Sequence, residues 1–165
     1  MALRPSGLAI LLIGTLVLTR IIEVKLMLAN MNDLPLVVVS ACALLDADNR
    51  VLIAQRPRGK NMAGLWEFPG GKLEIGETPE NALIRELKEE LAIETEASCF
   101  APFTFASHSY QDFNLLLALF VCRKWSGTVT PLECQVIKWV KPKSLKHFDM
   151  PPADKPLIAM LRDFL

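Results

Sequence analysis

The sequence predicts an α/β domain in which a mixed β-sheet is sandwiched between helices. Three observations carry this prediction. Several short runs are apolar and rich in β-branched residues, one amphipathic helix follows them in mid-chain, and a second closes the chain. These segments interleave without a regular strand–helix–strand rhythm, which indicates an α/β/α sandwich.

The strands are predicted from apolar runs bounded by turn residues. Residues 36–45 and 51–56 flank the turn sequence "DADNR", so we expect them to form a hairpin. A loop is expected over 57–64, and Pro69-Gly70-Gly71 is expected to interrupt regular structure. Further strands are predicted at 98–107, 113–125 and 134–140.

Two helices are predicted from their start signals and apolar spacing. Thr78 followed by Pro79 supplies a capping hydroxyl and a proline at the first helical position, so a helix is expected over 79–91. Apolar residues recur at helical spacing between Asp154 and Leu165, which predicts a closing amphipathic helix.

The N-terminus does not fit this domain pattern. Residues 5–19 carry no charge, but the run is shorter than the ~20 apolar residues of a membrane-spanning helix. A membrane anchor, a secretion signal and an extension from an upstream start codon all remain open, and we favour the extension. The domain is then predicted at 31–165, with 1–30 as an apolar N-terminal extension, and Met31 opens an ordinary domain start.

Composition excludes several classes of function. Lys plus Arg equal Asp plus Glu at 18 each, so no basic excess points to a nucleic-acid partner. Four cysteines without a CxxC pair and only two histidines argue against a zinc cluster and favour a reducing compartment. We expect a cytoplasmic protein, membrane-bound only if residues 5–19 are an anchor, and either a monomer or a homodimer.

The helix over 79–91 carries three carboxylates close together. Glu86, Glu89 and Glu90 have i, i+3 and i+4 spacing, and such like charges repel in a bare helix. A solvated surface is one explanation. The other is a hard divalent cation with oxygen ligands, which the preceding Gly-Gly turn favours because its backbone can approach an ion or phosphate closely.

The same residues resemble a known pattern. Gly71, Glu77 and "RELKEELAI" at 85–93, at the spacing found here, resemble the Nudix box of the Nudix hydrolase superfamily. One position departs, because the family usually has glycine where this chain has Ala92. The segments "WEFPGGKLEIGETPE" and "MPPADKPLI" further resemble MutT-type nucleoside triphosphate pyrophosphohydrolases, and the resemblance covers about residues 36–165.

The resemblance implies a Nudix-type α/β/α sandwich and a catalytic site that uses Mg²⁺ or Mn²⁺. The implied metal ligands are the Gly71 carbonyl, Glu86, Glu89, Glu90 and Glu133. Glu86 is our choice for the general base that takes the water proton, with Arg85 and Glu77 orienting the helix. Glu133 is the alternative base, and a solvated loop acid is its competing interpretation.

Substrate selection is implied at three other residues. Arg56 resembles a nucleotide-contacting arginine, and Phe68 is expected either to flank the base or to be a core aromatic. Asp154 falls where MutT has a base-reading asparagine, and it is expected to accept hydrogen bonds from guanine, to be held protonated by burial, or to cap the last helix. Phe113 and Asn114 stand where a guanine-contacting arginine would be expected. The nearby residues His108 and Tyr110 are expected either to line the pocket or to lie on the surface.

The implied activity is Mg²⁺-dependent hydrolysis of (deoxy)nucleoside triphosphates, with 8-oxo-dGTP favoured, to the monophosphate and pyrophosphate. Such an enzyme sanitises the nucleotide pool. Its partner is a small nucleotide, and no stable nucleic-acid partner is expected. Two alternatives are retained: hydrolysis of nucleotide sugars, dinucleoside polyphosphates or RNA 5′ ends, and a non-catalytic nucleotide-binding domain.

Overall fold

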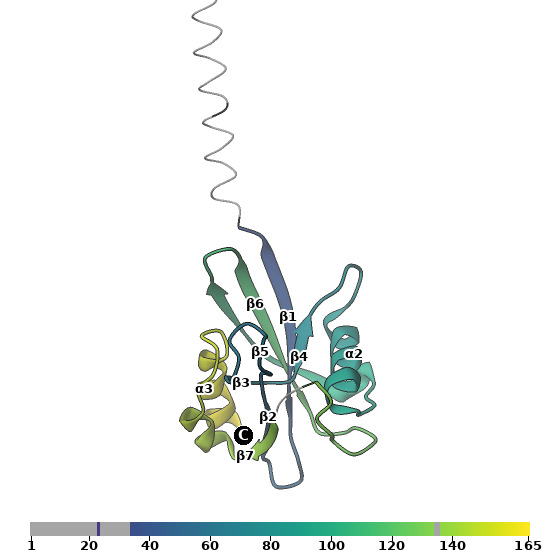
Figure 1. Ribbon diagram of the computed structural model, residues 1–165. Helices are drawn as coiled ribbons and strands as arrows, with labels where there is room; N and C mark the ends of the chain where they lie inside the picture. Colours follow the sequence, from purple (N-terminus) through teal and green to yellow (C-terminus); the bar gives the residue numbers. More distant parts are fainter. Residues whose placement is uncertain (1–22, 24–33, 134–135) are drawn as a thin grey trace, which may run out of the picture. The chain divides into compact units, whose positions relative to one another are not determined.

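The computed structural model describes residue 23, residues 34–133 and residues 136–165 (Figure 1). The chain divides into two compact units, Met1–Pro35 and Leu36–Leu165. The uncharged run at 5–19 lies outside the described residues, so its role and the predicted boundary after residue 30 stay predictions. Within the described part of the chain, no helix is both long and apolar enough to cross a membrane.

The second unit contains two β-sheets. Its strands are β1 Leu36–Leu44, β2 Val51–Gln55, β3 Trp66–Glu67, β4 Gly70–Lys72, β5 Phe100–Ser109, β6 Asn114–Cys122 and β7 Val136–Val140. One sheet has the order β4-β1-β6-β5 and the other β3-β2-β7. Strand β1 pairs with β6 in parallel and with β4 antiparallel, so the predicted mixed sheet is confirmed.

The predicted hairpin of 36–45 with 51–56 is wrong. Strands β1 and β2 lie in different sheets and are joined only by an isolated bridge between Leu45 and Val51. Both edges of β1 are occupied, since β4 and β6 pair with it on either side. Strand β2 therefore pairs with β3 and β7 instead.

The predicted break at Pro69-Gly70-Gly71 is right in part: regular structure is interrupted at Phe68 and Pro69, between β3 and β4, but Gly70–Lys72 forms a strand. Gly71 pairs with Ser40 of β1. Gly70 has φ +142°, and a Cβ at this position would lie 2.2 Å from the Ser40 carbonyl oxygen. Glycine at this position therefore lets two strands approach more closely than a side chain permits.

Helix α2 spans Pro79–Leu91, as the capping signals predict. The Thr78 hydroxyl accepts a hydrogen bond from the Asn81 N–H at 3.3 Å. The helix ends at Ala92, which has φ 56° and ψ 31° and donates its N–H to the Lys88 carbonyl. An alanine therefore occupies a left-handed position that usually holds glycine.

The core lies on both faces of β1, because successive residues of a strand point to opposite sides. Ala41 and Ala43 face the cluster that includes Leu157 and Leu161 of the closing helix α3, Lys155–Phe164. Cys42 and Leu44 face the cluster that includes the fully buried leucines of α2: Leu83, Leu87 and Leu91.

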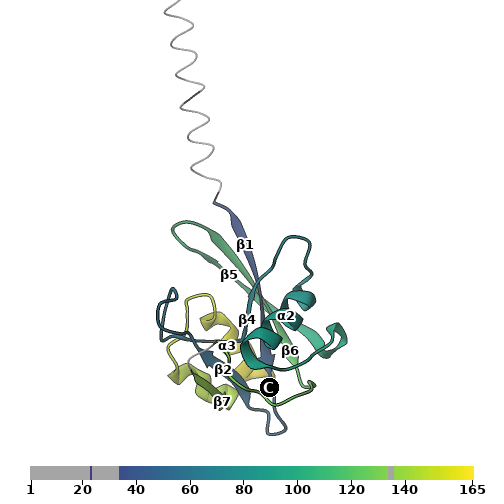
Figure 2. The same ribbon diagram turned by 45° about the vertical axis from the view of Figure 1, so that its right-hand side comes forward.

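Figures 1 and 2 show the strands between α2 and α3, which is the predicted sandwich of helices and sheets. Burial of each leucine side chain on α2 contributes about 1.5–3 kcal/mol, so this face holds the helix in register against the sheet. Two short 3₁₀ helices, η1 Ala97–Cys99 and η2 Pro142–His147, complete the unit.

Candidate active site

A cavity of about 380 Å³ is lined by strands β1, β2, β3, β4 and β6, by helix α2, and by the segments after β2, between β5 and β6, before β7 and before α3. Its apolar wall comes from strand residues such as Val39 and Leu117. The acidic side chains that line it are Glu67, Glu86, Glu90, Glu133 and Asp154. The cationic ones are Arg56, Lys60 and Lys72.

Two carboxylates of α2 meet the double glycine. A Cβ on Gly71 would lie 2.0 Å from Glu86 Oε1, so only glycine lets this carboxylate lie against the β4 backbone. Glu90 Oε2 accepts a hydrogen bond from the Gly70 N–H at 3.3 Å. The structure thus brings together three of the predicted metal ligands, namely Gly71, Glu86 and Glu90.

Like charges are crowded at this end of the cavity. The pKa of Glu90 is raised to about 7, chiefly by burial and also by the Glu67 and Glu86 carboxylates, against the opposing effect of the Gly70 amide. A divalent cation relieves such repulsion, and carboxylate and carbonyl oxygens are the ligands that Mg²⁺ prefers. The residues present therefore fit a divalent metal.

Arg85 fastens the start of α2 to the preceding loop. Its Nε and Nη2 donate to the two carboxylate oxygens of Glu77, each at 3.0 Å, and its Nη1 donates to Glu86 Oε1 at 2.8 Å. Hydrogen bonds from Arg85 and from the Glu74 N–H lower the pKa of Glu77. Arg85 therefore contacts Glu86 from outside the cavity, and neither Arg85 nor Glu77 lines it.

Glu89 takes a different direction from its two neighbours. Its side chain is 52% exposed, lies 3.6 Å from Arg85 Nη1 and does not line the cavity. Across residues 34–133 and 136–165, no three acidic, Cys or His side chains already meet in a group that could hold a metal ion. Basic side chains engage the acids instead, so metal binding requires some of these carboxylates to rotate.

Glu133 is engaged by a cation outside the Arg85 network, and its segment lies beside α2, since the Leu132 N–H donates to the Glu90 carbonyl. Glu133 Oε2 is 3.5 Å from Lys60 Nζ, and both side chains are more than half exposed. Both residues line the cavity. Glu133 is therefore placed with Glu86 and Glu90, although Lys60 was not among the predicted site residues.

Glu67 is a second residue that sequence reasoning missed. It pairs with Arg56 Nη1, while Arg56 Nε donates to the Asn61 carbonyl at 2.8 Å. Burial raises the pKa of Glu67 despite the opposing charge of Arg56. An acid inside the apolar run "LWEF" was the available signal, because glutamate is seldom buried without a partner.

The far end of the cavity holds Asp154 and Phe68. The pKa of Asp154 is raised to about 7, chiefly by burial and also by the Glu67 charge, while the Phe68 amide and Arg56 oppose this shift. Asp154 immediately precedes α3, but its side chain makes no capping hydrogen bond. It lines the cavity instead. Phe68 is 3% exposed and joins the core, as one of its two expected roles requires, and it also lines the cavity, while its contact with a base stays a prediction.

Two aromatic residues complete this end. Tyr110 and Phe113 line the cavity, and their ring centroids are 4.9 Å apart. Neither His108 nor Asn114 lines it: His108 packs edge-on against Tyr110, and Asn114 Oδ1 accepts a hydrogen bond from Ser109. The position expected to hold an arginine is therefore occupied by aromatic surface.

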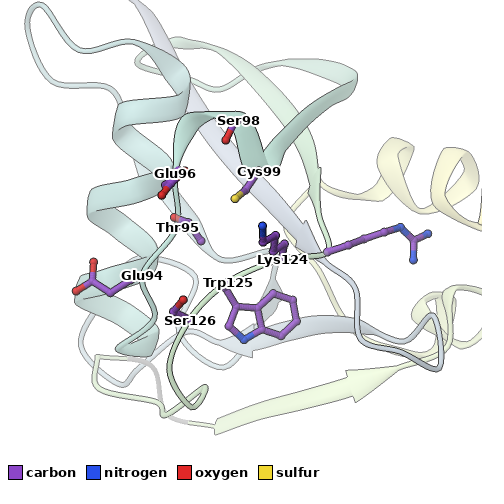
Figure 3. A pocket seen from close by; sticks show the side chains of 9 residues that line it. Glu94, Thr95, Glu96, Ser98, Cys99, Lys124, Trp125 and Ser126 are labelled. Carbon is purple, nitrogen blue, oxygen red and sulfur yellow. The ribbon is translucent and has the colours of Figure 1, made fainter.

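A second cavity of about 360 Å³ lies beyond the C-terminal end of α2 (Figure 3). It is lined by residues of 94–99 and 123–126, including Cys99, Lys124 and Trp125. None of the predicted site residues lines it. The chemistry implied by the sequence thus belongs to the first cavity.

Comparison with known proteins agrees with this geometry. The family model described as NUDIX domain matches residues 40–160. An 8-oxo-dGTP diphosphatase of Proteus vulgaris is 45% identical over 92 residues, which cover 56% of this chain and 80% of that protein. A CTP pyrophosphohydrolase of Escherichia coli (strain K12) is 36% identical over 118 residues, covering 70% of this chain and 84% of that protein.

Solved structures give the same relationship. The solution structure of the E. coli ORF135 protein has a TM-score of 0.69 at 31% identity, and covers 79% of this chain and 91% of that chain. A MutT structure from work on Aliivibrio salmonicida and Vibrio cholerae has a TM-score of 0.66 at 30% identity, and covers 79% and 99% of the two chains.

Proposed function

The chain belongs to the NUDIX domain family and is a Nudix hydrolase, and from this premise we propose that it hydrolyses nucleoside triphosphates to the monophosphate and pyrophosphate. The observation that carries the proposal is the meeting of Glu86 and Glu90 at the Gly70–Gly71 backbone, inside a cavity that also has an apolar, aromatic end. One end suits a polyphosphate with its metal, and the other suits a base.

The carboxylate end is proposed to hold Mg²⁺, with Mn²⁺ as a substitute. The proposed ligands are the Gly71 carbonyl, Glu86, Glu89, Glu90 and Glu133. A bound divalent cation would neutralise phosphate charge and lower the pKa of a bound water. Glu89 joins this set only after its side chain turns from Arg85 into the cavity, which is a rotation about its own single bonds.

Glu86 is proposed as the general base. Arg85 donates to Glu86 Oε1 at 2.8 Å, which leaves Oε2 to accept the proton of the attacking water. Arg85 and Glu77 act through Glu86, as positioning residues that keep its carboxylate against Gly71. Because the carboxylate is held before substrate arrives, little reorganisation is needed when the water attacks.

The base end is proposed to select the nucleotide through Arg56, Phe68 and Asp154. We propose 8-oxo-dGTP as the preferred substrate, which gives a cytoplasmic nucleotide-sanitising role without a stable nucleic-acid partner. Hydrolysis of CTP is the second candidate. Guanine and cytosine both carry an exocyclic amine that donates to a carboxylate, and the relative that acts on CTP is 36% identical to this chain.

The deciding experiment is steady-state hydrolysis of a substrate panel by the full chain with Mg²⁺. The panel contains 8-oxo-dGTP, dGTP, CTP and dCTP, together with a nucleotide sugar and a dinucleoside polyphosphate. We expect pyrophosphate and monophosphate from a triphosphate, with 8-oxo-dGTP giving the highest kcat/KM. Turnover of the last two compounds but of no triphosphate would contradict the proposal, and so would the absence of all turnover.

A further inference from the structure

Lys60 lies on the loop that joins β2 to β3, in the part 57–64 that was expected only to form a loop. Two hydrogen bonds close the base of this loop, from the Arg56 N–H to the Leu65 carbonyl and from the Gly64 N–H to the Arg56 carbonyl. Lys60 is exposed, yet its side chain lines the cavity. The loop therefore presents an ammonium group to the carboxylate end from outside α2.

The pairing of Lys60 with Glu133 is weak enough to be exchanged. The separation of Nζ and Oε2 is 3.5 Å, and the two side chains are 57% and 54% exposed. Ion pairs with this exposure contribute about 0–1 kcal/mol. Lys60 lines the same cavity as Glu67 and Glu90 and interacts electrostatically with both carboxylates.

Two arginines near this site are held more firmly. Arg56 is engaged by the Glu67 carboxylate and the Asn61 carbonyl. Arg85 donates to Glu77, Glu86 and the Lys72 carbonyl. By contrast, Lys60 has a single long contact, and its partner is a proposed metal ligand.

We propose that Lys60 is a substrate-binding residue that exchanges anions, pairing with Glu133 in the free protein and with the triphosphate of the substrate in the complex. The inference rests on the proposed function. A metal ion that takes Glu133 must displace the ammonium, and an incoming polyphosphate offers that ammonium a new anion. Lys60 therefore competes with metal when no nucleotide is present and assists binding when the nucleotide arrives.

The experiment compares Lys60→Met with Arg58→Met in the full chain. Both substitutions remove one exposed positive charge from the same loop, but Arg58 does not line the cavity. Two quantities are measured: the Kd of Mn²⁺ for the nucleotide-free protein, by electron paramagnetic resonance of free Mn²⁺, and the KM of the best triphosphate at saturating Mg²⁺.

Lys60→Met is expected to tighten Mn²⁺ binding about 2–5-fold, which corresponds to the loss of an exposed ion pair, and to raise KM about 5–10-fold. Arg58→Met is expected to change each quantity by less than about twofold. The double variant Lys60→Met/Glu133→Gln should bind Mn²⁺ no more tightly than Glu133→Gln alone.

Equal effects of Lys60→Met and Arg58→Met would overturn the inference. Weaker Mn²⁺ binding by Lys60→Met together with a higher KM would overturn it as well. The Mn²⁺ measurement needs no turnover. Failure of the wild-type protein to hydrolyse any triphosphate therefore defeats the proposed function, whereas an unchanged Mn²⁺ Kd in Lys60→Met defeats the exchange at Glu133.

Discussion

The two ends of the cavity are built in different ways. At the carboxylate end, Glu86 and Glu90 come from one helix whose buried leucines fix its register, and Arg85 and Glu77 brace it from within the same twenty residues. At the base end, Arg56 and Phe68 lie on either side of the β2–β3 connection, whereas Asp154 comes from the segment before α3, far along the chain. Most of the proposed catalytic residues therefore come from one short segment, with Glu133 as the exception, while the proposed selectivity depends on how distant segments pack.

The largest expected effect comes from a substitution at the carboxylate end of the cavity. Glu86→Gln keeps the size of the side chain but removes the proposed proton acceptor, so kcat should fall about 10²–10⁴-fold. The measurement is pyrophosphate release at saturating triphosphate and Mg²⁺. Glu80→Gln, on the same helix but outside the cavity lining, is the control and should retain wild-type kcat. Equal kcat values for the two variants would contradict the assignment of Glu86 as the general base.

The second expected effect comes from Asp154, the buried acid at the base end of the cavity. The folded-state pKa of Asp154, about 7, is above the usual value of 3.8, so its contribution to stability is present below about pH 4 and is lost as pH rises through 7. Asp154→Asn removes this titration and keeps an oxygen that accepts from the Phe68 amide. We expect the variant to be more stable than wild type by about 1–3 kcal/mol at pH 8, and nearly equal at pH 4.

Urea denaturation at the two pH values measures this difference. Asp163→Asn serves as the control, because Asp163 is an exposed aspartate whose pKa is lowered by Arg162. A stability difference between wild type and Asp154→Asn that does not grow with pH would contradict the burial of an ionisable group here.

The third effect tests whether the base end also binds phosphate charge. Arg56→Lys keeps the positive charge but loses the planar group that now meets both Asn61 and Glu67. KM for the triphosphate should rise about tenfold, which corresponds to about 1.4 kcal/mol. Arg123→Lys changes a remote exposed arginine bonded to Asn49 and is the matched control. A KM that is unchanged in Arg56→Lys would remove Arg56 from the proposed substrate contacts.

The smallest expected effect concerns Ala92, at the C-terminal end of α2. Ala92 holds a left-handed conformation that glycine adopts without strain, so Ala92→Gly should stabilise the protein by about 0.5–1 kcal/mol after the greater chain entropy of glycine is deducted. Urea denaturation measures the change. Ala101→Gly, on the exposed face of β5, should have the opposite sign, and destabilisation by both substitutions would show that the helix end is not strained.

The sequence by itself determined helix α2, its cap at Thr78 and the placement of Glu86 and Glu90 on one side. These features follow from helical periodicity and from side-chain bonds to nearby backbone, which involve residues close in sequence. The predicted strands were largely recovered, with β1 at Leu36–Leu44 and β5 at Phe100–Ser109. Resemblance to the Nudix box added the family, which the comparisons confirm.

Only the tertiary structure decided how β1 and β2 are shared between two sheets, because strand pairing depends on which edges remain open after distant segments have packed. The same is true of Glu67, which becomes a site residue only once β3 lies beside Arg56. Glu89 differs, because its neighbour Arg85 lies four residues earlier on the same helix, so this contact follows from helical spacing. Periodicity assigns a residue to a face, whereas the direction of a long charged side chain depends on the charges that folding brings near it.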